Sequence, residues 1–141
     1  MNKIPVYERE VQYYETDQMQ IVHHSNYIRW FEEARLMAMK FLGAPYDVLE
    51  EKGIVIPVLA ASAVYRAPFR FGDIFQVRLK IVKFNGLKMD IEYEIYNKDS
   101  GILSTTGQTS HAFLGQDRKP LRLKKEFPEV YTVFQNAVCQ D

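Results

Sequence analysis

The fold is decided by residues 13–27, which read YYETDQMQIVHHSNY. An extended stretch over residues 6–14 leads to Asp17, and seven residues later His24 stands where a helical pattern begins. Apolar residues then recur every three or four positions, which predicts one amphipathic helix over about residues 24–42. Its predicted buried face consists of Tyr27, Ile28, Phe31, Ala34, Ala38, Phe41 and Leu42.

The residues at the ends and on the polar face of this segment are also typical of a helix. Ser25 or Asn26 is expected to cap its start, and Gly43 followed by Pro45 is expected to end it. Charged residues on the polar face have the spacing of intrahelical ion pairs. The expected pairs are Arg29 with Glu33 and Glu32 with Arg35.

Beyond this helix the sequence predicts an antiparallel sheet. Alternating stretches over residues 73–84 and 87–97 flank Asn85-Gly86, a pair typical of a type I′ hairpin turn. Apolar residues over 54–69 and a Thr- and Ser-rich stretch over 102–114 add further strands. Because the sheet must be covered on one side, we predict an α+β fold with the sheet wrapped around the long helix. Shorter helices are expected at about residues 46–52 and 126–138.

Composition predicts one soluble domain over residues 1–141. Hydrophobic residues make up 47% of the chain, which is enough for one core, and no break in composition suggests a second domain. Eighteen basic and eighteen acidic residues balance, which argues against nucleic acid as a partner. The chain has no apolar run long enough to span a bilayer, and the single Cys139 cannot form an internal disulfide. These features predict a cytoplasmic protein.

A carboxylate just ahead of a helix start suits acyl-transfer chemistry. The first N–H groups of a helix lack internal partners, so they favour a carbonyl oxygen that gains negative charge. The main-chain N–H of His24 is the candidate donor, and Asp17 is the candidate nucleophile or general base. The alternative role for Asp17 is that of a turn-forming residue between strand and helix.

The three histidines do not form a metal site by sequence. His23 and His24 are neighbours on the predicted helix start, so their side chains point about 100° apart. No Cys, His or carboxylate spacing supplies further ligands, and no metal is therefore expected. His23 is expected to be structural, and His111 is expected to be a core or interface histidine without a catalytic role.

The pattern Asp17-x-x-x-x-Val22-x-His24-x-x-Tyr27, followed by WFEEAR at residues 30–35, resembles the signature of the 4-hydroxybenzoyl-CoA thioesterase family. Arg66-Ala67-Pro68 and Gly72-Asp73 add weaker support, while Gln20 stands where many members have glycine. The resemblance implies a hotdog fold, a homodimer or homotetramer, and hydrolysis of an acyl-CoA thioester at Asp17 without a cofactor. The candidate substrate-binding residues are Val22, Asn26, Tyr27 and Ser62, with Ser62 approaching the Asp17 loop of a partner protomer.

Two alternatives remain beside acyl-CoA hydrolysis. The first is an enzyme that acts on acyl groups carried by acyl carrier protein, and the second is a non-catalytic hotdog module that binds acyl thioesters. A CoA tail would need cations for its phosphates. The candidates are Arg66, Arg70, Lys83, Lys88 and the basic segment 117–125.

Overall fold

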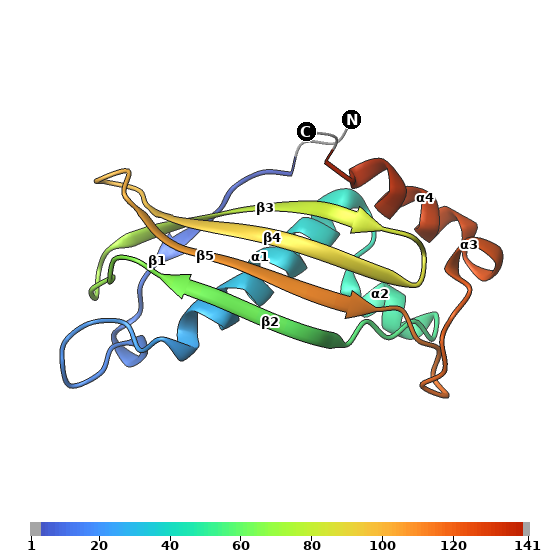
Figure 1. Ribbon diagram of the computed structural model, residues 1–141, viewed down its shortest axis with the longest axis horizontal. Coiled ribbons are helices and arrows are strands. Elements are labelled where there is room, and N and C mark those ends of the chain that lie inside the picture. Colours follow the sequence, from blue (N-terminus) through green and yellow to red (C-terminus); the bar gives the residue numbers. More distant parts are fainter. Residues whose placement is uncertain (1–3, 140–141) are drawn as a thin grey trace.

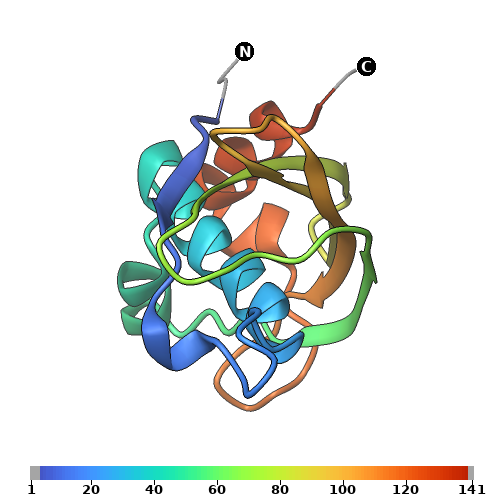
Figure 2. The same cartoon turned by 90° about the vertical axis from the view of Figure 1, so that its left-hand side faces the viewer.

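The computed structural model describes residues 4–139 and shows an antiparallel sheet curled around one long helix (Figures 1 and 2). Helix α1 (Ser25–Leu42) lies along the inner face of the sheet, which confirms the predicted α+β hotdog fold. The strands lie in the order β1-β3-β4-β5-β2. Their bounds are β1 (Tyr7–Glu10), β2 (Val58–Tyr65), β3 (Ile74–Phe84), β4 (Lys88–Asn97) and β5 (Leu103–Ala112).

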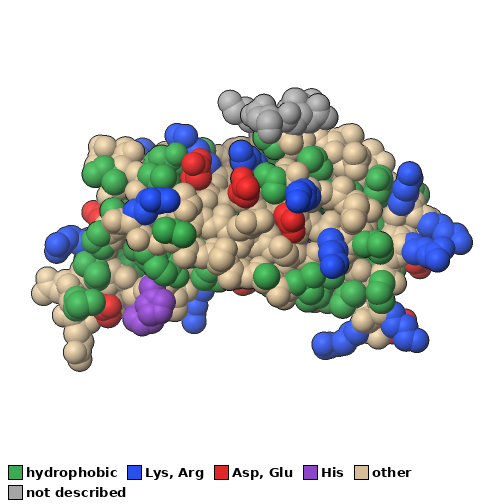
Figure 3. All heavy atoms as spheres, viewed as in Figure 1, with side chains coloured by type: hydrophobic (Ala, Val, Ile, Leu, Met, Phe, Trp, Pro, Cys, Tyr) green, Lys and Arg blue, Asp and Glu red, His purple; other side chains and the backbone are tan. Residues whose placement is uncertain are grey.

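Alternation along the strands separates an apolar inner face from a charged outer face. On β4, Met89, Ile91, Tyr93 and Ile95 are buried against α1. The residues between them face solvent, where acidic and basic side chains cross the sheet (Figure 3).

Among the described residues, no helix combines the length and apolar character needed to cross a bilayer.

Stacked aromatic rings fix α1 on the sheet. Trp30 lies flat on Phe75 with ring centroids 3.8 Å apart, and Phe31 lies on Tyr93 at 4.3 Å. Phe31 also occupies the space above Gly107, where an added Cβ would stand 2.3 Å from its ring. The position of the helix therefore depends on the missing side chain at residue 107.

Several details of α1 differ from the sequence prediction. Phe41 is 51% exposed, whereas Met39 and Leu42 in the same last turn are buried, so Phe41 lies outside the buried face of the helix. Neither Ser25 nor Asn26 caps the start, since His24 occupies the N-cap position. Gly43 ends the helix as predicted, with a left-handed φ of 91°.

The predicted ion pairs along α1 do not form, because one member of each pair, Glu33 or Arg35, contacts the sheet instead. Glu33 binds Arg9 and the Tyr7 hydroxyl of β1, each at 2.8 Å. Arg35 donates instead to the hydroxyl of Tyr93, with a distance of 3.2 Å from Nη1 to the oxygen. A tertiary contact has replaced a local one in each case.

The remaining elements flank this core. They are a 3₁₀ turn η1 (Tyr13–Glu15), α2 (Tyr46–Glu51), α3 (Leu123–Glu126) and α4 (Pro128–Ala137). The helix predicted at 126–138 is α4, and α3 is a separate short helix ahead of it, because Pro128 has no N–H to continue α3 and starts α4 instead. In the β3–β4 turn only Gly86 has a positive φ, while Asn85 accepts two main-chain N–H groups, so the type I′ geometry was wrong.

Strand β2 forms one edge of the sheet and is almost entirely exposed. Its apolar side chains include Val58, Leu59, Val64 and Tyr65, which are between 47% and 54% exposed. An edge with unpaired main-chain groups and apolar side chains is a surface that proteins normally cover or pair.

A string of polar side chains runs through the core beneath α1. The Tyr93 hydroxyl lies 2.7 Å from Thr109 Oγ1, which lies 2.8 Å from His111 Nε2. Arg35 can only donate to Tyr93, whereas either atom can be the donor in the two bonds that follow. The other ring nitrogen of His111, Nδ1, has no hydrogen-bond partner among residues 4–139.

Burial of His111 predicts a pH-dependent stability. Burial, together with the Arg35 charge, lowers the pKa of His111 to about 4 and outweighs the raising effects of Asp90 and the Pro57 carbonyl. The unfolded chain then binds a proton that the folded protein does not. We expect stability to fall between about pH 6.5 and pH 4, by up to about 3 kcal/mol, and to be unaffected by this group above that window.

Urea unfolding followed across this pH range checks the expectation. His111→Gln keeps an acceptor for Thr109 but cannot titrate, so its profile should be flatter than that of the wild type between pH 6.5 and 4. His23→Gln removes an exposed imidazole and should keep the wild-type profile. Parallel profiles for the wild type and His111→Gln would contradict the assignment.

Candidate active site

Asp17 lies at the head of a tight loop between η1 and α1. Its N–H donates to the Ile21 carbonyl, and its own carbonyl accepts from the Gln20 N–H, both at 2.9 Å. Its carboxylate accepts the Met19 N–H through Oδ1 at 2.8 Å and is partly exposed. Gln20 adopts a left-handed φ of 66°, so this chain forms with glutamine a turn that glycine forms without strain. The turn-forming role and the chemical role of Asp17 are compatible, because Oδ2 is left free by this bond.

The Glu15 carbonyl ties both arms of this loop to the helix start. It accepts the His23 N–H at 2.9 Å and the side-chain amide of Asn26 at 3.0 Å. Val22 adds a second tie, since its N–H donates to the Phe69 carbonyl at 2.8 Å and its side chain is buried. The loop that holds Asp17 and the first turn of α1 are therefore one connected unit.

The Glu15 side chain is an ion-pair centre that the sequence did not single out. Its carboxylate accepts Arg9 at 2.7 Å, the Trp30 indole at 2.8 Å and the Gln12 N–H at 2.8 Å, and it is 3% exposed. Burial raises the pKa of Glu15, but the bonds from Arg9, Trp30 and Gln12 outweigh it and hold the pKa below its usual value. A charged residue without a periodic pattern gives no sequence signal, and only the fold shows these partners together.

The first turn of α1 contains one unused main-chain donor. The N–H groups of Asn26 and Tyr27 donate to the His23 and His24 carbonyls, and the Ser25 N–H donates to His23 Nδ1. The His23 N–H is taken by Glu15. The His24 N–H alone in this run donates to no atom of the described chain, at the positive end of the helix.

Aromatic rings form one wall beside His24. The Tyr65 ring lies 5.2 Å from the Tyr27 ring and 6.0 Å from the His24 ring, so the end of β2 adjoins the helix start. Tyr27 is 4% exposed, and burial raises its pKa. Tyr65 is 47% exposed and is thus the more accessible of the two rings. Tyr65 was not predicted from the sequence, because its position beside His24 depends on which end of β2 meets α1.

The other predicted substrate-binding residues are placed differently. Asn26 is buried and uses its side-chain amide to join Glu15 and His23, and Val22 is buried in the core. Ser62 faces away from α1, on the outer face of β2, so within one protomer it lies apart from Asp17 and His24. Of the predicted residues, Asp17, His24 and Tyr27 share the end of the molecule at which α1 begins.

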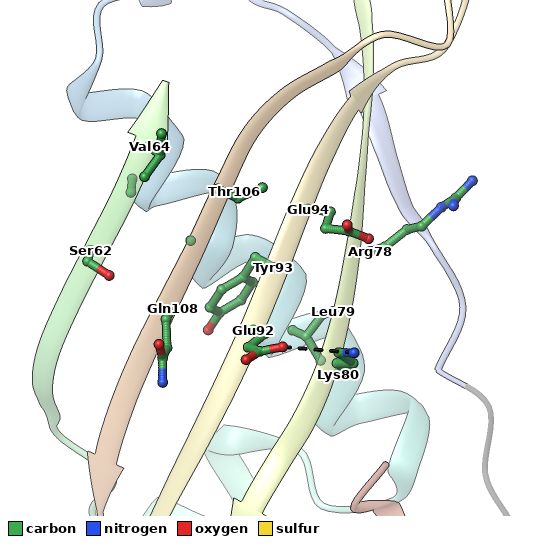
Figure 4. A pocket seen from close by; sticks show the side chains of 12 residues that line it. Ser62, Val64, Arg78, Leu79, Lys80, Glu92, Tyr93, Glu94, Thr106 and Gln108 are labelled. Atoms are coloured by element: carbon green, nitrogen blue, oxygen red, sulfur yellow. Dashed lines mark ion pairs between the residues drawn. The ribbon is translucent and has the colours of Figure 1, made fainter. Parts of the chain in front are cut away.

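Ser62 lines a shallow hollow of about 460 Å³ on the outer face of the sheet (Figure 4). Its floor is the sheet itself, and its polar side chains include Gln108 and the ion pair of Lys80 with Glu92 at 3.8 Å. The ion pair is about half exposed, as expected for a solvated sheet surface. Among the residues that line this hollow, Ser62 has no hydrogen-bonded base beside it within the described chain.

The cations considered for a CoA tail lie at two ends of the molecule. Arg66 and Arg70 lie on the β2–β3 connection, whose Phe69 carbonyl holds Val22, and so share the end that carries Asp17. Lys83 and Lys88 flank the β3–β4 turn at the other end, next to α3 (Figure 1). Within residues 4–139 no group of three or more His, Cys, Asp or Glu side chains is arranged to hold a metal ion.

Comparison with known proteins places this chain and its fold in a family. The sequence profile of the Thioesterase-like superfamily matches residues 11–137. A putative acyl-CoA thioesterase of Bacillus subtilis, YneP, is 38% identical over 131 residues, covering 92% of this chain and 94% of its own. A DHNA-CoA thioesterase structure from Staphylococcus aureus is 34% identical with a TM-score of 0.88, covering 93% of this chain and 88% of its own.

A third relative, the 1,4-dihydroxy-2-naphthoyl-CoA thioesterase Slr0204 of Synechocystis, is 25% identical with a TM-score of 0.83. The alignment covers 96% of this chain and 95% of that one. The chain belongs to the Thioesterase-like superfamily, which confirms the predicted enzyme class, a thioester hydrolase. The narrower assignment to the 4-hydroxybenzoyl-CoA thioesterase family is not confirmed, since these relatives carry other names.

Proposed function

We propose that this protein hydrolyses an acyl-CoA thioester to a carboxylic acid and free CoA, with Asp17 and the His24 N–H as its catalytic groups. The observation that supports the proposal is the N–H of His24, which has no partner among residues 4–139, in a helix start whose neighbouring amides are all engaged. A thioester oxygen that accepts this N–H is polarised in the direction that stabilises a tetrahedral intermediate.

Two routes use the free oxygen of Asp17. In the first, Oδ2 attacks the thioester carbon, the C–S bond breaks, CoA leaves as a thiolate, and water hydrolyses the resulting anhydride. In the second, Asp17 removes a proton from a water molecule that attacks the same carbon. The Met19 N–H on Oδ1 orients the carboxylate in both routes. Neither route requires a metal or an organic cofactor.

The relatives favour a hydroxylated aromatic acyl group. The Staphylococcus structure is named a DHNA-CoA thioesterase, and the Synechocystis protein is named for the 1,4-dihydroxy-2-naphthoyl group. The CoA phosphates are assigned to Arg66 and Arg70, because these two cations share the end of the molecule with Asp17. Acyl carrier protein is the alternative carrier of the acyl group. A cytoplasmic location of the enzyme stays a prediction.

The release of thiol from a panel of acyl-CoA esters tests the proposal. The panel contains hydroxyaroyl, aroyl and straight-chain acyl groups, and a thiol-reactive dye follows free CoA. Turnover of at least one ester, well above the uncatalysed rate, is the expected result. Binding of the esters without release of thiol would instead support a non-catalytic acyl-binding module.

Replacing His24 with alanine is expected to reduce kcat less than loss of the Asp17 charge does. The proposed contribution of His24 is its main-chain N–H, which alanine retains. The comparison is made on purified variants with one ester at saturation. A loss as large as that of Asp17→Asn, in a folded protein, would show that the imidazole takes part in the chemistry.

The edge strand β2 supports a homodimer as the working form. Pairing of β2 with β2 of a second protomer would satisfy its main-chain groups and bury Val58, Leu59 and Val64. Such pairing would also bring Ser62 of one protomer toward the Asp17 loop of the other. We expect sedimentation at micromolar concentration to give at least twice the 16.5 kDa chain mass. A fully active species at the single-chain mass would rule out a shared site.

A further inference from the structure

The polar string of Arg35, Tyr93, Thr109 and His111 has one outer end, and that end is a cation. Arg35 is partly exposed, and its guanidinium donates to the neutral hydroxyl of Tyr93. No ion pair joins Arg35 to a carboxylate within residues 4–139. A guanidinium has five N–H donors, so most of its hydrogen-bonding capacity is not used by this contact.

Arg35 lies on the same stripe of α1 as the proposed oxyanion donor. It follows His24 by 11 residues, which is about three turns and about 16 Å along the helix axis. Its side chain leans back toward the helix start, as helical side chains do. The distance from the His24 N–H to the guanidinium is therefore shorter than the rise of the helix between them.

This stripe faces strand β2 rather than β1. Glu33, which binds β1, is two residues and about 200° away from Arg35 around the helix. The string leads from Arg35 through Tyr93 to Thr109, which pairs across the strands with Ala61 of β2. Arg35 thus lies near the middle of β2, on the inner face of the sheet.

The inner face of β2 is uncovered along this distance. Tyr65 and Ala61 both point toward the helix side, because their partners Thr105 and Thr109 are buried there, yet both are exposed. Tyr65 adjoins His24, and Ala61 adjoins the polar string. Four residues of strand separate them, or about 13 Å. The distance from the proposed thioester position at His24 to Arg35 is therefore similar whether it is counted along α1 or along β2.

We propose that Arg35, held by the hydroxyl of Tyr93, forms the far end of the acyl site and selects acyl groups that carry a hydroxyl or carboxylate about 8 to 10 Å beyond the thioester carbonyl. The inference rests on the proposed thioester hydrolysis, since it places the reacting carbon at His24. Arg35 is then a specificity-determining residue, and Tyr93 is the residue that positions it.

The chemistry of the string explains the selection. A hydroxyl or carboxylate oxygen accepts the unused N–H groups of Arg35, whereas a plain ring edge or methyl end would desolvate the guanidinium without replacing its water. Tyr93 cannot withdraw, because its ring is 1% exposed and stacked on Phe31. A site of this kind rejects an analogue that lacks the polar group.

Two esters that differ by one distal oxygen test the proposal: 6-hydroxy-2-naphthoyl-CoA and 2-naphthoyl-CoA. We expect the wild type to favour the hydroxylated ester by about tenfold or more in kcat/KM. The preference should fall close to one in Arg35→Met, fall in part in Tyr93→Phe, and survive in part in Arg35→Lys. Arg29→Met alters an exposed cation elsewhere on α1 and should keep the full preference.

The ratio of kcat/KM for the two esters distinguishes a loss of selectivity from a loss of folding, because a misfolded or weakened variant loses activity on both. An unchanged ratio in Arg35→Met, with thiol still released, would overturn the role of Arg35 and leave the proposed function standing. Should the wild type release no thiol from these two esters or from any other ester of the panel, the proposed function fails. The naphthoyl fluorescence of the two esters bound to wild type and Arg35→Met then measures the same preference as a ratio of dissociation constants. Equal affinities would overturn the inference as well.

Discussion

Replacing Asp17 with asparagine is expected to lower kcat by about 10² to 10⁴, the usual cost of losing a nucleophile or general base. Asparagine keeps an oxygen for the Met19 N–H, so the turn at the head of the loop is preserved. The lost charge is the only change at the reacting centre. The measurement is the rate of thiol release with the best ester of the panel, with folding checked by circular dichroism.

Asp73→Asn provides the matched control for this variant. Asp73 also accepts a main-chain N–H in a turn, that of Arg70 at 2.9 Å, but is not part of the proposed chemistry. It should retain wild-type kcat. A folded Asp17→Asn enzyme with more than about a tenth of the wild-type kcat would remove Asp17 from the mechanism.

A side chain at residue 107 is expected to destabilise the protein severely. In Gly107→Val the first added atom alone would lie 2.3 Å from the Phe31 ring and 2.9 Å from the Ser62 carbonyl. Phe31 belongs to α1, is fully buried and is stacked on the Tyr93 ring, so its ring cannot move aside without displacing the helix. We expect the free energy of unfolding to fall by about 3 kcal/mol or more, measured by urea denaturation.

Two further variants show whether the clash is with Phe31. Gln108→Val adds a branched side chain at the next position of β5, on the exposed outer face, and should change stability little. Phe31→Leu removes part of the ring and should recover some of the stability lost in Gly107→Val. If Gly107→Val unfolds at the wild-type urea concentration, Phe31 does not fix the height of α1 above the sheet.

The sequence alone predicted those helices and strands in which burial of one face sets the spacing of the apolar residues. The alternation in residues 87–97 and the helical spacing from Tyr27 to Leu42 both reflect one buried face, and both were confirmed. The same rule misplaced Phe41, because periodicity does not show which residues at the edge of an apolar stripe are covered. It also misassigned the ion pairs of Glu33 and Arg35, because spacing along a helix says nothing about β1 or Tyr93.

The candidate site was predictable only in its local part. Asp17 and His24 are close in sequence and joined by one loop, so their pattern was visible. Glu15 and Arg9 act through a tertiary ion pair, and Tyr65 depends on the antiparallel order of β2 beside α1. The capping role expected of Asn26 was wrong because its amide reaches back to the Glu15 carbonyl instead.

That carbonyl of Glu15 has a consequence for how such an enzyme can change over evolutionary time. It holds His23 and Asn26, so the spacing between the acid loop and the helix start is set outside the tip of the loop. Residues 18–20 are exposed, and the turn uses the main-chain N–H groups of Met19 and Gln20 rather than their side chains. Their side chains are therefore free to diverge under selection for new substrates while the proposed catalytic groups keep their spacing. Met19 and Gln20, in place of smaller residues, are an outcome that this separation permits.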